Sequence, residues 1–247
     1  MLRAQPLTAA LLAVATTLAA AQAPAVMTPP QKRPFSLQTD FGLVNTAGNT
    51  STTTFNAGDA LSFTSGPWSV GQTFAVVYGR TDGKRSAENY VVALRGDYRI
   101  RDGLGTYLGG RWTRDRFAGI SRRFEEGMGL TFRAVTSPET ELAFEAGASL
   151  NQQWSTNGTR DRFASGRGAL RYKRMINKAA YFKQLAEVLP NLIEGNDVRV
   201  NSESALVAPI STRVALKASY VVKFDNEPQP GFETTDRYLT SGLQVVF

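Results

Sequence analysis

The sequence contains no cysteine and no histidine among its 247 residues. The lack of cysteine excludes a disulfide framework, a zinc site built from thiolates and a lipid anchor on a processed cysteine. The lack of histidine removes the commonest general base and metal ligand, so a Ser-His-Asp hydrolase is excluded on any fold. Only unusual serine–lysine or carboxylate mechanisms remain, and we therefore expect a protein that is not an enzyme.

Motifs for cofactors are also missing. The tracts Gly103-Leu104-Gly105 and Gly127-Met128-Gly129 lack the third glycine and the strand-to-helix context of a dinucleotide fingerprint. Glycine on a barrel face more simply relieves crowding or permits bending, so no cofactor is expected. The excess of 28 basic over 21 acidic residues is spread along the chain rather than gathered in one patch, which argues against a nucleic-acid partner.

The N-terminus has the pattern of a cleavable signal peptide. Arg3 supplies a short charged region, Leu7 to Leu18 is almost wholly apolar, and Ala19 to Ala21 provide small residues for cleavage after Ala21. The apolar run is shorter than the roughly 20 residues that span a bilayer, which favours a signal over an anchor. We therefore predict a signal peptide over residues 1–21 and a proline-rich periplasmic lead-in over residues 22–34.

Beyond Phe35 no apolar run is long enough for a membrane helix, and helical periodicity is limited to an ambiguous stretch from Tyr181 to Ile193. Apolar and polar residues instead alternate, which is typical of strands with one apolar and one polar face. In the segment Val214 to Phe224, Leu216 and Val222 fall on the apolar face and Lys217 on the polar one. About twelve such segments follow one another, with expected starts near Phe35, Thr50, Ser69, Glu88, Gly105, Arg122, Glu141, Arg160, Lys178, Asp197, Thr212 and Phe232.

The connections between these segments alternate between short turns and longer polar loops. Short turns are expected at residues 65–67, 101–103, 137–139, 176–178 and 209–211. Longer connections are expected at 81–86, 115–121, 155–160, 190–196 and 225–233, with a tight one near 46–49. Transmembrane barrels have short periplasmic turns and longer external loops. We therefore predict one domain over residues 35–247: an all-β, antiparallel, up-and-down transmembrane β-barrel of about 12 strands in the bacterial outer membrane.

The C-terminal segment closes the argument for a barrel. Leu239, Ser241, Leu243, Val245 and Phe247 share one face, and Phe247 is the last residue. A terminal phenylalanine on an alternating strand is the signal that the outer-membrane barrel assembly machinery reads. We expect this strand to pair with the first one, because an open sheet edge cannot be tolerated in hydrocarbon. The expected partners are thus outer-membrane lipid and the assembly machinery, with small solutes or ions added if the lumen conducts.

The polar faces identify candidate residues of the lumen. The carboxylates Asp97, Glu145, Glu187 and Glu203 fall on these faces, and so do basic residues nearby in the alternation: Arg95, Arg111, Arg133, Arg167, Arg171, Lys183 and Lys217. Such a set is compatible with a charged constriction and equally with a salt-bridged plug that satisfies a polar interior. Small barrels are filled by side chains and barrels of about 16 strands hold a channel, so twelve strands decide neither alternative.

Short motifs along the chain resemble the salt-induced outer-membrane protein family, a YdiY-like domain of unknown function numbered 481. The resemblance covers about Phe35 to Phe247. It rests on Asn45-Thr46-Ala47-Gly48-Asn49-Thr50, on Asn201-Ser202-Glu203-Ser204-Ala205-Leu206, and on the ending from Asp225-Asn226-Glu227-Pro228 through Thr235-Asp236-Arg237-Tyr238-Leu239 to Phe247. The family implies an outer-membrane barrel and a link to salt or osmotic stress, and it supplies no catalytic or ligand-binding residue.

Three functional hypotheses follow. The first is a narrow channel for ions or small solutes in envelope homeostasis, and the second is a non-conducting structural or surface-interaction barrel. The third is an envelope enzyme without histidine, which we do not expect.

Overall fold

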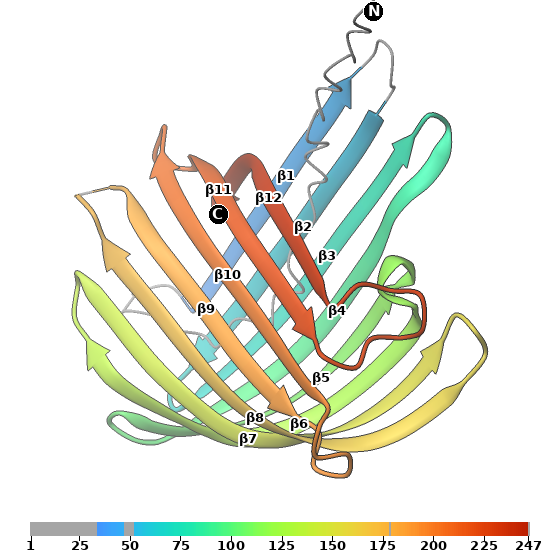
Figure 1. The fold of residues 1–247 in the computed structure, drawn as a ribbon. Helices are drawn as coiled ribbons and strands as arrows, with labels where there is room; N and C mark the ends of the chain where they lie inside the picture. The colour runs from blue at the N-terminus through green and yellow to red at the C-terminus, as the bar shows by residue number, and fades with distance from the viewer. Residues whose placement is uncertain (1–33, 47–51, 178, 247) are drawn as a thin grey trace, which may run out of the picture.

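The computed structural model describes residues 34–46, 52–177 and 179–246, and the side chains of residues 43–46, 52, 238 and 246 are not described. Twelve strands form a closed barrel in which each strand pairs antiparallel with its neighbours in sequence (Figure 1). The strands are β1 (Phe35–Thr46), β2 (Thr52–Ser65), β3 (Trp68–Thr81), β4 (Lys84–Arg101), β5 (Leu104–Asp115), β6 (Ile120–Thr136), β7 (Thr140–Ser155), β8 (Arg160–Met175), β9 (Tyr181–Pro190), β10 (Val198–Pro209), β11 (Val214–Asp225) and β12 (Thr235–Val246).

The barrel closes between the first and the last strand, as the sequence predicts. Gln38 of β1 faces Val246 of β12, and the pairing continues to Phe41 opposite Leu243. This closure leaves no unpaired sheet edge, which is the condition for β-structure in hydrocarbon. The predicted signal peptide, most of the lead-in and Phe247 lie outside the described residues.

Alternation along each strand puts apolar side chains on the outside. On β6, Phe124, Met128, Leu130 and Phe132 are all exposed on the outer face, whereas Thr131 on the other face is buried. On β11, Leu216 is exposed and Lys217 points inward to Asp40. The predicted period of two is thus the period of the barrel wall, with apolar residues outside and polar residues inside.

Some connections have the predicted lengths and others do not. The β3–β4 connection, expected as a longer loop over residues 81–86, is a two-residue turn of Asp82 and Gly83. Both residues have positive φ, 49° and 75°, which fits the tight turn that an Asp-Gly pair favours between antiparallel strands. The connections after β9 and β11, residues 191–197 and 226–234, are the longest, as predicted. The connections after β5 (116–119, with the short helix η1, Arg116–Ala118) and β7 (156–159) are also predicted to be longer, but they are no longer than those after β8 (176–180) and β10 (210–213) at the other end.

The stretch from Tyr181 to Ile193, ambiguous between helix and strand in the sequence, forms strand β9 up to Pro190. Among residues 34–46, 52–177 and 179–246, no helix is long and apolar enough to cross a membrane.

Candidate functional site: an ionic layer across the barrel lumen

Charged side chains from four strands meet in the middle of the lumen. We call this set the ionic layer: Arg95 and Asp97 of β4, Glu145 of β7, Arg167 and Arg171 of β8, and Glu187 of β9. The Glu145 carboxylate lies at its centre, with no exposed side-chain surface, and accepts hydrogen bonds from three guanidinium groups. The contacts of Arg167 and Arg171 join β8 to its neighbours β7 and β9. The Arg95–Glu145 contact instead joins β4 and β7, which are three places apart in the barrel order, so the layer extends into the lumen there.

The distances within the ionic layer are those of strong ion pairs. Arg95 lies 2.8 Å from Glu145 and 2.8 Å from Asp97. Arg167 lies 2.7 Å from Glu145 and 2.7 Å from Glu187. Arg171 completes the set at 3.1 Å from Glu145. Charge-assisted hydrogen bonds of this kind are the strong class, and each buried charge here has an opposite charge as its partner.

Tyr107 of β5 is held between two arginines of this layer. Its ring centroid lies 4.0 Å from the guanidinium carbon of Arg95 and 5.3 Å from that of Arg167, and its hydroxyl accepts a hydrogen bond from Arg167 at 2.8 Å. The ring lies over Gly129 and Gly147, where an added Cβ would come within 2.7 and 2.6 Å of the tyrosine oxygen. The two glycines therefore provide the space that lets Tyr107 lie against the wall.

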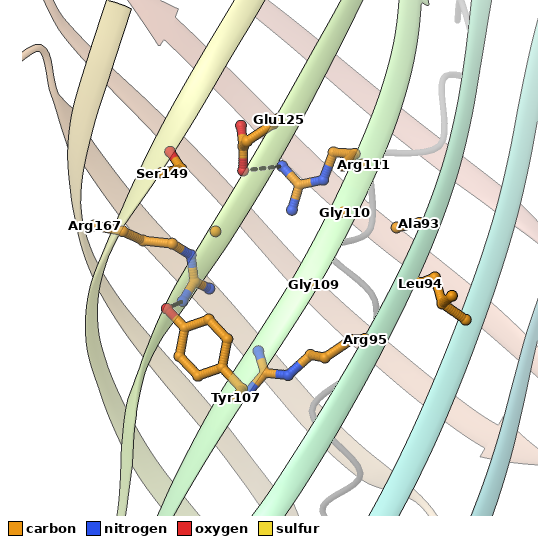
Figure 2. Close-up of a pocket in the computed structure, with 11 residues that line it drawn as sticks. Ala93, Leu94, Arg95, Tyr107, Gly109, Gly110, Arg111, Glu125, Ser149 and Arg167 are labelled. Atoms are coloured by element: carbon orange, nitrogen blue, oxygen red, sulfur yellow. Dashed lines mark hydrogen bonds and ion pairs between the residues drawn. The ribbon is translucent and has the colours of Figure 1, made fainter.

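A small cavity of about 50 Å³ lies beside this tyrosine. Arg111 and Glu125 face each other across it at 3.7 Å (Figure 2), and the wall between them includes Gly109 and Gly127, which have no side chain to fill it. Arg111 also lies 4.0 Å from Glu187 of β9, four strands away around the barrel. The cavity has room for small species only, since one water occupies about 30 Å³.

At the end of the barrel that carries the longer loops, an ion pair crosses the whole lumen. Lys223 of β11 lies 3.2 Å from Asp115 of β5, and these two strands stand opposite each other in the twelve-strand order. Asn89 also donates a hydrogen bond to Asp115, at 2.5 Å. We call the Lys223–Asp115 pair the mouth bridge. Because one lysine and one aspartate suffice to join the opposite walls, the lumen is narrow at this level.

The β11–β12 loop covers the same end. Its Gln229 and Phe232 pack on Gly119 of the β5–β6 connection, where an added Cβ would come within 2.8 Å of Gln229. Asn157 of the β7–β8 connection donates a hydrogen bond to Gln229 at 3.5 Å. Figure 1 shows the red β11–β12 loop reaching the green β5–β6 connection. The loop thus extends from one wall of the barrel to the other.

A second inward cluster lies near the β1–β12 closure. Lys217 of β11 bridges Asp40 at 3.2 Å and Glu203 at 3.5 Å. Gln244 of β12 donates a hydrogen bond to Asp40 and accepts one from Tyr181, both at 3.1 Å. These bonds tie β9, β10, β11 and β12 to β1 through side chains inside the lumen, next to the seam where the barrel closes.

The structure distributes the candidates from the sequence over these groups. Arg95, Asp97, Glu145, Arg167 and Arg171 meet in the ionic layer, together with Glu187. Arg111 lines the adjacent cavity, and Lys217 belongs to the cluster at the closure. Lys183 lies apart from the ionic layer, with its Nζ 5.3 Å from the centre of the Tyr181 ring. Arg133 follows Thr131 on the inner face of β6, near Gly105.

Sequence reasoning did not identify Tyr107, Asp115 or Lys223. Tyr107 carried a signal, because it alternates with Gly105 and Gly109 on one face of β5, which marks a large inward side chain between small ones. The mouth bridge carried none, since no local pattern connects two positions 108 residues apart. No group of three or more acidic side chains in the described part of the chain is placed to hold a metal ion.

An apolar outer surface around an ion-paired interior is the reverse of a soluble barrel, and it defines the class of transmembrane β-barrels. Within that class, the sequence from residue 39 to residue 247 matches the family described as "Protein of unknown function, DUF481". The match covers most of the chain, and the protein belongs to this family, as the resemblance in its motifs predicts.

Comparison with known proteins gives one curated relative and several solved barrels. The protein is 26% identical over 220 residues to "Uncharacterized protein YdiY" of Escherichia coli K12, covering 86% of this chain and 83% of that one. The NanC porin structure matches with a TM-score of 0.48 and 9% identity over 86% of this chain and 97% of that one. The NalP translocator domain of Neisseria meningitidis matches with a TM-score of 0.43 and 14% identity, covering 86% of each chain.

Proposed function

We propose that the protein is an outer-membrane barrel that provides a narrow path for ions or small solutes, and that the mouth bridge restricts this path at low ionic strength. The observation that carries the proposal is the Lys223–Asp115 pair, which joins opposite walls with a single contact. Its side chains are 18% and 8% exposed, whereas Glu145 is fully buried. Salt screens partly exposed pairs more than buried ones, so rising ionic strength weakens the mouth bridge before it weakens the ionic layer.

The location in the outer membrane is part of the same proposal. It is supported by the apolar exterior, by the position of the two longest connections, 191–197 and 226–234, at one end, and by the signal-peptide pattern of the sequence. A restriction that responds to salt also agrees with the link to salt or osmotic stress that the family resemblance implies.

The charge of the lumen favours small anions over cations. Arg123 hydrogen-bonds to Gln153, Lys183 lies against Tyr181, and Arg199 hydrogen-bonds to Ser165. In the described part of the lumen, the closest polar or aromatic contacts of these three basic groups are thus with neutral side chains. The carboxylates Asp97, Glu145 and Glu187, in contrast, each pair with an arginine. The remaining positive potential attracts anions. Ion-paired carboxylates are poor general acids, so we propose a passive path and no catalysis.

Planar-bilayer recording of the refolded mature protein tests this function. We expect conductance steps that grow faster than the conductivity of the solution as KCl is raised, because screening adds to the number of carriers. Lys223→Gln breaks the mouth bridge and should give large steps already at low salt. Lys84→Gln, an exposed lysine in the β3–β4 turn, is the matched control and should behave like the wild type.

Complete silence of well-folded wild-type protein and of Lys223→Gln would refute the channel. It would favour the second candidate, a non-conducting structural barrel, which the burial of the ionic layer supports. Steps that scale only with bulk conductivity and are unchanged in Lys223→Gln would refute the role of the mouth bridge while leaving the channel intact.

A further inference from the structure

Arginine side chains gather on the outer surface of one side of the barrel, at the end that carries the longer loops. We call this group the arginine belt. Its members come from β3 to β8 and from η1: Arg80, Arg85, Arg114, Arg116, Arg122 and Arg160. None of them belongs to the ionic layer or to the mouth bridge. Charged side chains on the lipid-facing side of a barrel cost free energy at the midplane and little near the interfaces, so their level in the membrane matters.

The first half of the arginine belt surrounds one carboxylate. Arg114 and Arg116 lie 3.1 and 3.9 Å from Glu88, and Arg85 pairs with the other oxygen of Glu88. Arg80 donates a hydrogen bond to the Tyr78 hydroxyl at 2.8 Å. The Glu88 side chain is only 6% exposed beneath these groups, while Arg85 and Arg116 are 44% and 47% exposed. One acidic group therefore serves several cations, and the excess charge faces outward.

The second half has no carboxylate partner in the described structure. The guanidinium carbons of Arg122 and Arg160 lie 4.2 and 4.8 Å from the Trp154 ring. Stacking on an indole orients a guanidinium through cation–π attraction and leaves its N–H groups open to an acceptor. Two such groups held on one tryptophan form a pair of oriented donors for a multivalent anion.

Aromatic residues mark the level of the arginine belt. Trp112 precedes Arg114 by two positions on the outer face of β5, and Phe124 follows Arg122 by two positions on β6. Phe124 packs edge-on against Trp154, with ring centroids 6.1 Å apart. Tyrosine and tryptophan collect where hydrocarbon meets the headgroups. Arg122 and Arg160 lie directly opposite Trp154 on the neighbouring strands. The arginine belt therefore stands at this aromatic row and the step beyond it, the level of lipid headgroups.

The other end of the same strands is different. Its outer positions carry Trp68, Tyr98 and Phe132, which are exposed, and Trp68 packs on Tyr98 with ring centroids 4.6 Å apart. Arg174 of β8 is an exposed outer arginine at this end. Arg237 of β12 is an exposed outer arginine at the end of the longest loops, but on the far side of the barrel from the arginine belt. The positive charge thus distinguishes one membrane face, and one side of the barrel, from the rest.

We propose that the arginine belt binds the phosphate groups of a phosphorylated glycolipid in the outer leaflet. Guanidinium groups pair with phosphate bidentately, and oriented arginines are the preferred residues for this recognition. A lipid source follows from the position, because the belt stands next to the acyl chains that cover the aromatic row, where basic clusters recognise headgroups. This inference rests on the proposed location in the outer membrane, with the longer loops on the external side.

Native mass spectrometry of the refolded mature protein tests the lipid site, with diphosphorylated lipid A and phosphatidylethanolamine competing in the same detergent solution. We expect wild type to retain lipid A in preference to phosphatidylethanolamine. Arg122→Gln together with Arg160→Gln should weaken the retention of lipid A by about tenfold, which corresponds to the loss of one strong contact. Arg174→Gln together with Arg237→Gln is the matched control, since it removes two outer arginines from other places, and should leave the preference unchanged.

A second variant tests whether the glutamine variant loses lipid A only because it fails to fold. A gel-mobility assay distinguishes failure of the glycolipid site from failure of the proposed membrane location. The double variant Arg122→Lys with Arg160→Lys keeps the charge but loses the planar donors. It should weaken the retention of lipid A by about two- to threefold. Boiled and unboiled samples are compared on gels, because a folded barrel resists detergent until heated. A folded protein without preference for lipid A, or a double glutamine variant that keeps the preference, overturns the glycolipid site alone. Inorganic phosphate that displaces lipid A would overturn the lipid source. A protein with no heat-modifiable form would refute the membrane barrel itself.

Discussion

Replacing Glu145 by glutamine tests whether the ionic layer holds the barrel together. The substitution keeps the size of the side chain and removes the negative charge at the point where Arg95, Arg167 and Arg171 converge. Arg95 retains Asp97 as a partner and Arg167 retains Glu187. Arg171 has no second carboxylate partner among the described residues, so it is the guanidinium left with an uncompensated charge.

The magnitude follows from this count of partners. Removing one member of a buried ion pair costs about 3 to 5 kcal/mol, because the other charge stays buried without compensation. Since two of the three arginines keep a carboxylate, we expect the lower end, about 3 kcal/mol. With a urea dependence of about 2 kcal/mol per M, the unfolding midpoint should fall by about 1.5 M.

The assay is urea unfolding of the protein refolded into lipid vesicles, followed by tryptophan fluorescence and by heat-modifiable gel mobility. Glu139→Gln is the control, because Glu139 is exposed in the β6–β7 connection, outside the membrane-spanning wall. It should change stability by less than about 0.5 kcal/mol. Combining Glu145→Gln with Arg171→Gln should recover part of the loss, since the unpaired cation is then removed. If Glu145→Gln unfolds at the wild-type midpoint, the carboxylate does not compensate the arginines and the interior is hydrated.

Three further perturbations test the wall, the face assignment and the assembly signal. Gly147→Ala puts a Cβ 2.3 Å from a backbone oxygen and 2.6 Å from the Tyr107 hydroxyl, so the refolding yield measured on a mobility gel should drop. Gly96→Ala is the control and should fold normally, because no atom lies within 4 Å of its added Cβ. Leu216→Arg puts a charge on the lipid face and should lower the free energy of unfolding in vesicles by about 2 to 4 kcal/mol. If Leu216→Arg folds as well as the wild type while Lys217→Leu does not fold, the assignment of the two faces of β11 is inverted. Deleting Phe247 should strongly reduce the amount of protein assembled in the outer membrane and should have little effect on the unfolding midpoint of protein that has already folded. A loss of stability that accounts for the whole loss of assembled protein would contradict a role in assembly.

The wall of the barrel could be predicted from the sequence because its physical rule is local. A strand between lipid and a polar lumen must alternate, so Leu216 and Lys217 could be assigned to opposite faces without knowing which strands are neighbours. The antiparallel order followed from the short connections, and the closure of Leu243 on Phe41 from the cost of an open edge in hydrocarbon. The Asp82-Gly83 turn also had a local signal, because an Asp-Gly pair is typical of tight hairpins. The polar residues around this pair led instead to the prediction of a longer loop.

The contacts inside the lumen could not be predicted in the same way. Alternation places Asp115 and Lys223 on inner faces, but their meeting depends on the curvature of a sheet whose strands are six places apart in the barrel order. The position of Tyr107 depends on Gly129 and Gly147, which belong to two other strands. Such contacts depend on register and curvature together, and neither is specified by the residues of one strand.

The ionic layer and the arginine belt follow the same electrostatic rule: a charge removed from water needs an opposite charge nearby. In the ionic layer, buried charges survive because each meets an opposite charge within about 3 Å, as Arg167 does with Glu145 and Glu187. On the outer surface, Arg122 and Arg160 stack on the ring of Trp154 and have no carboxylate partner among the described residues. A cation at the edge of hydrocarbon without a carboxylate is stable only where anions are plentiful, and the headgroup layer is such a place. The ionic layer therefore carries its counter-charges within the chain, whereas Arg122 and Arg160 must obtain theirs from the membrane.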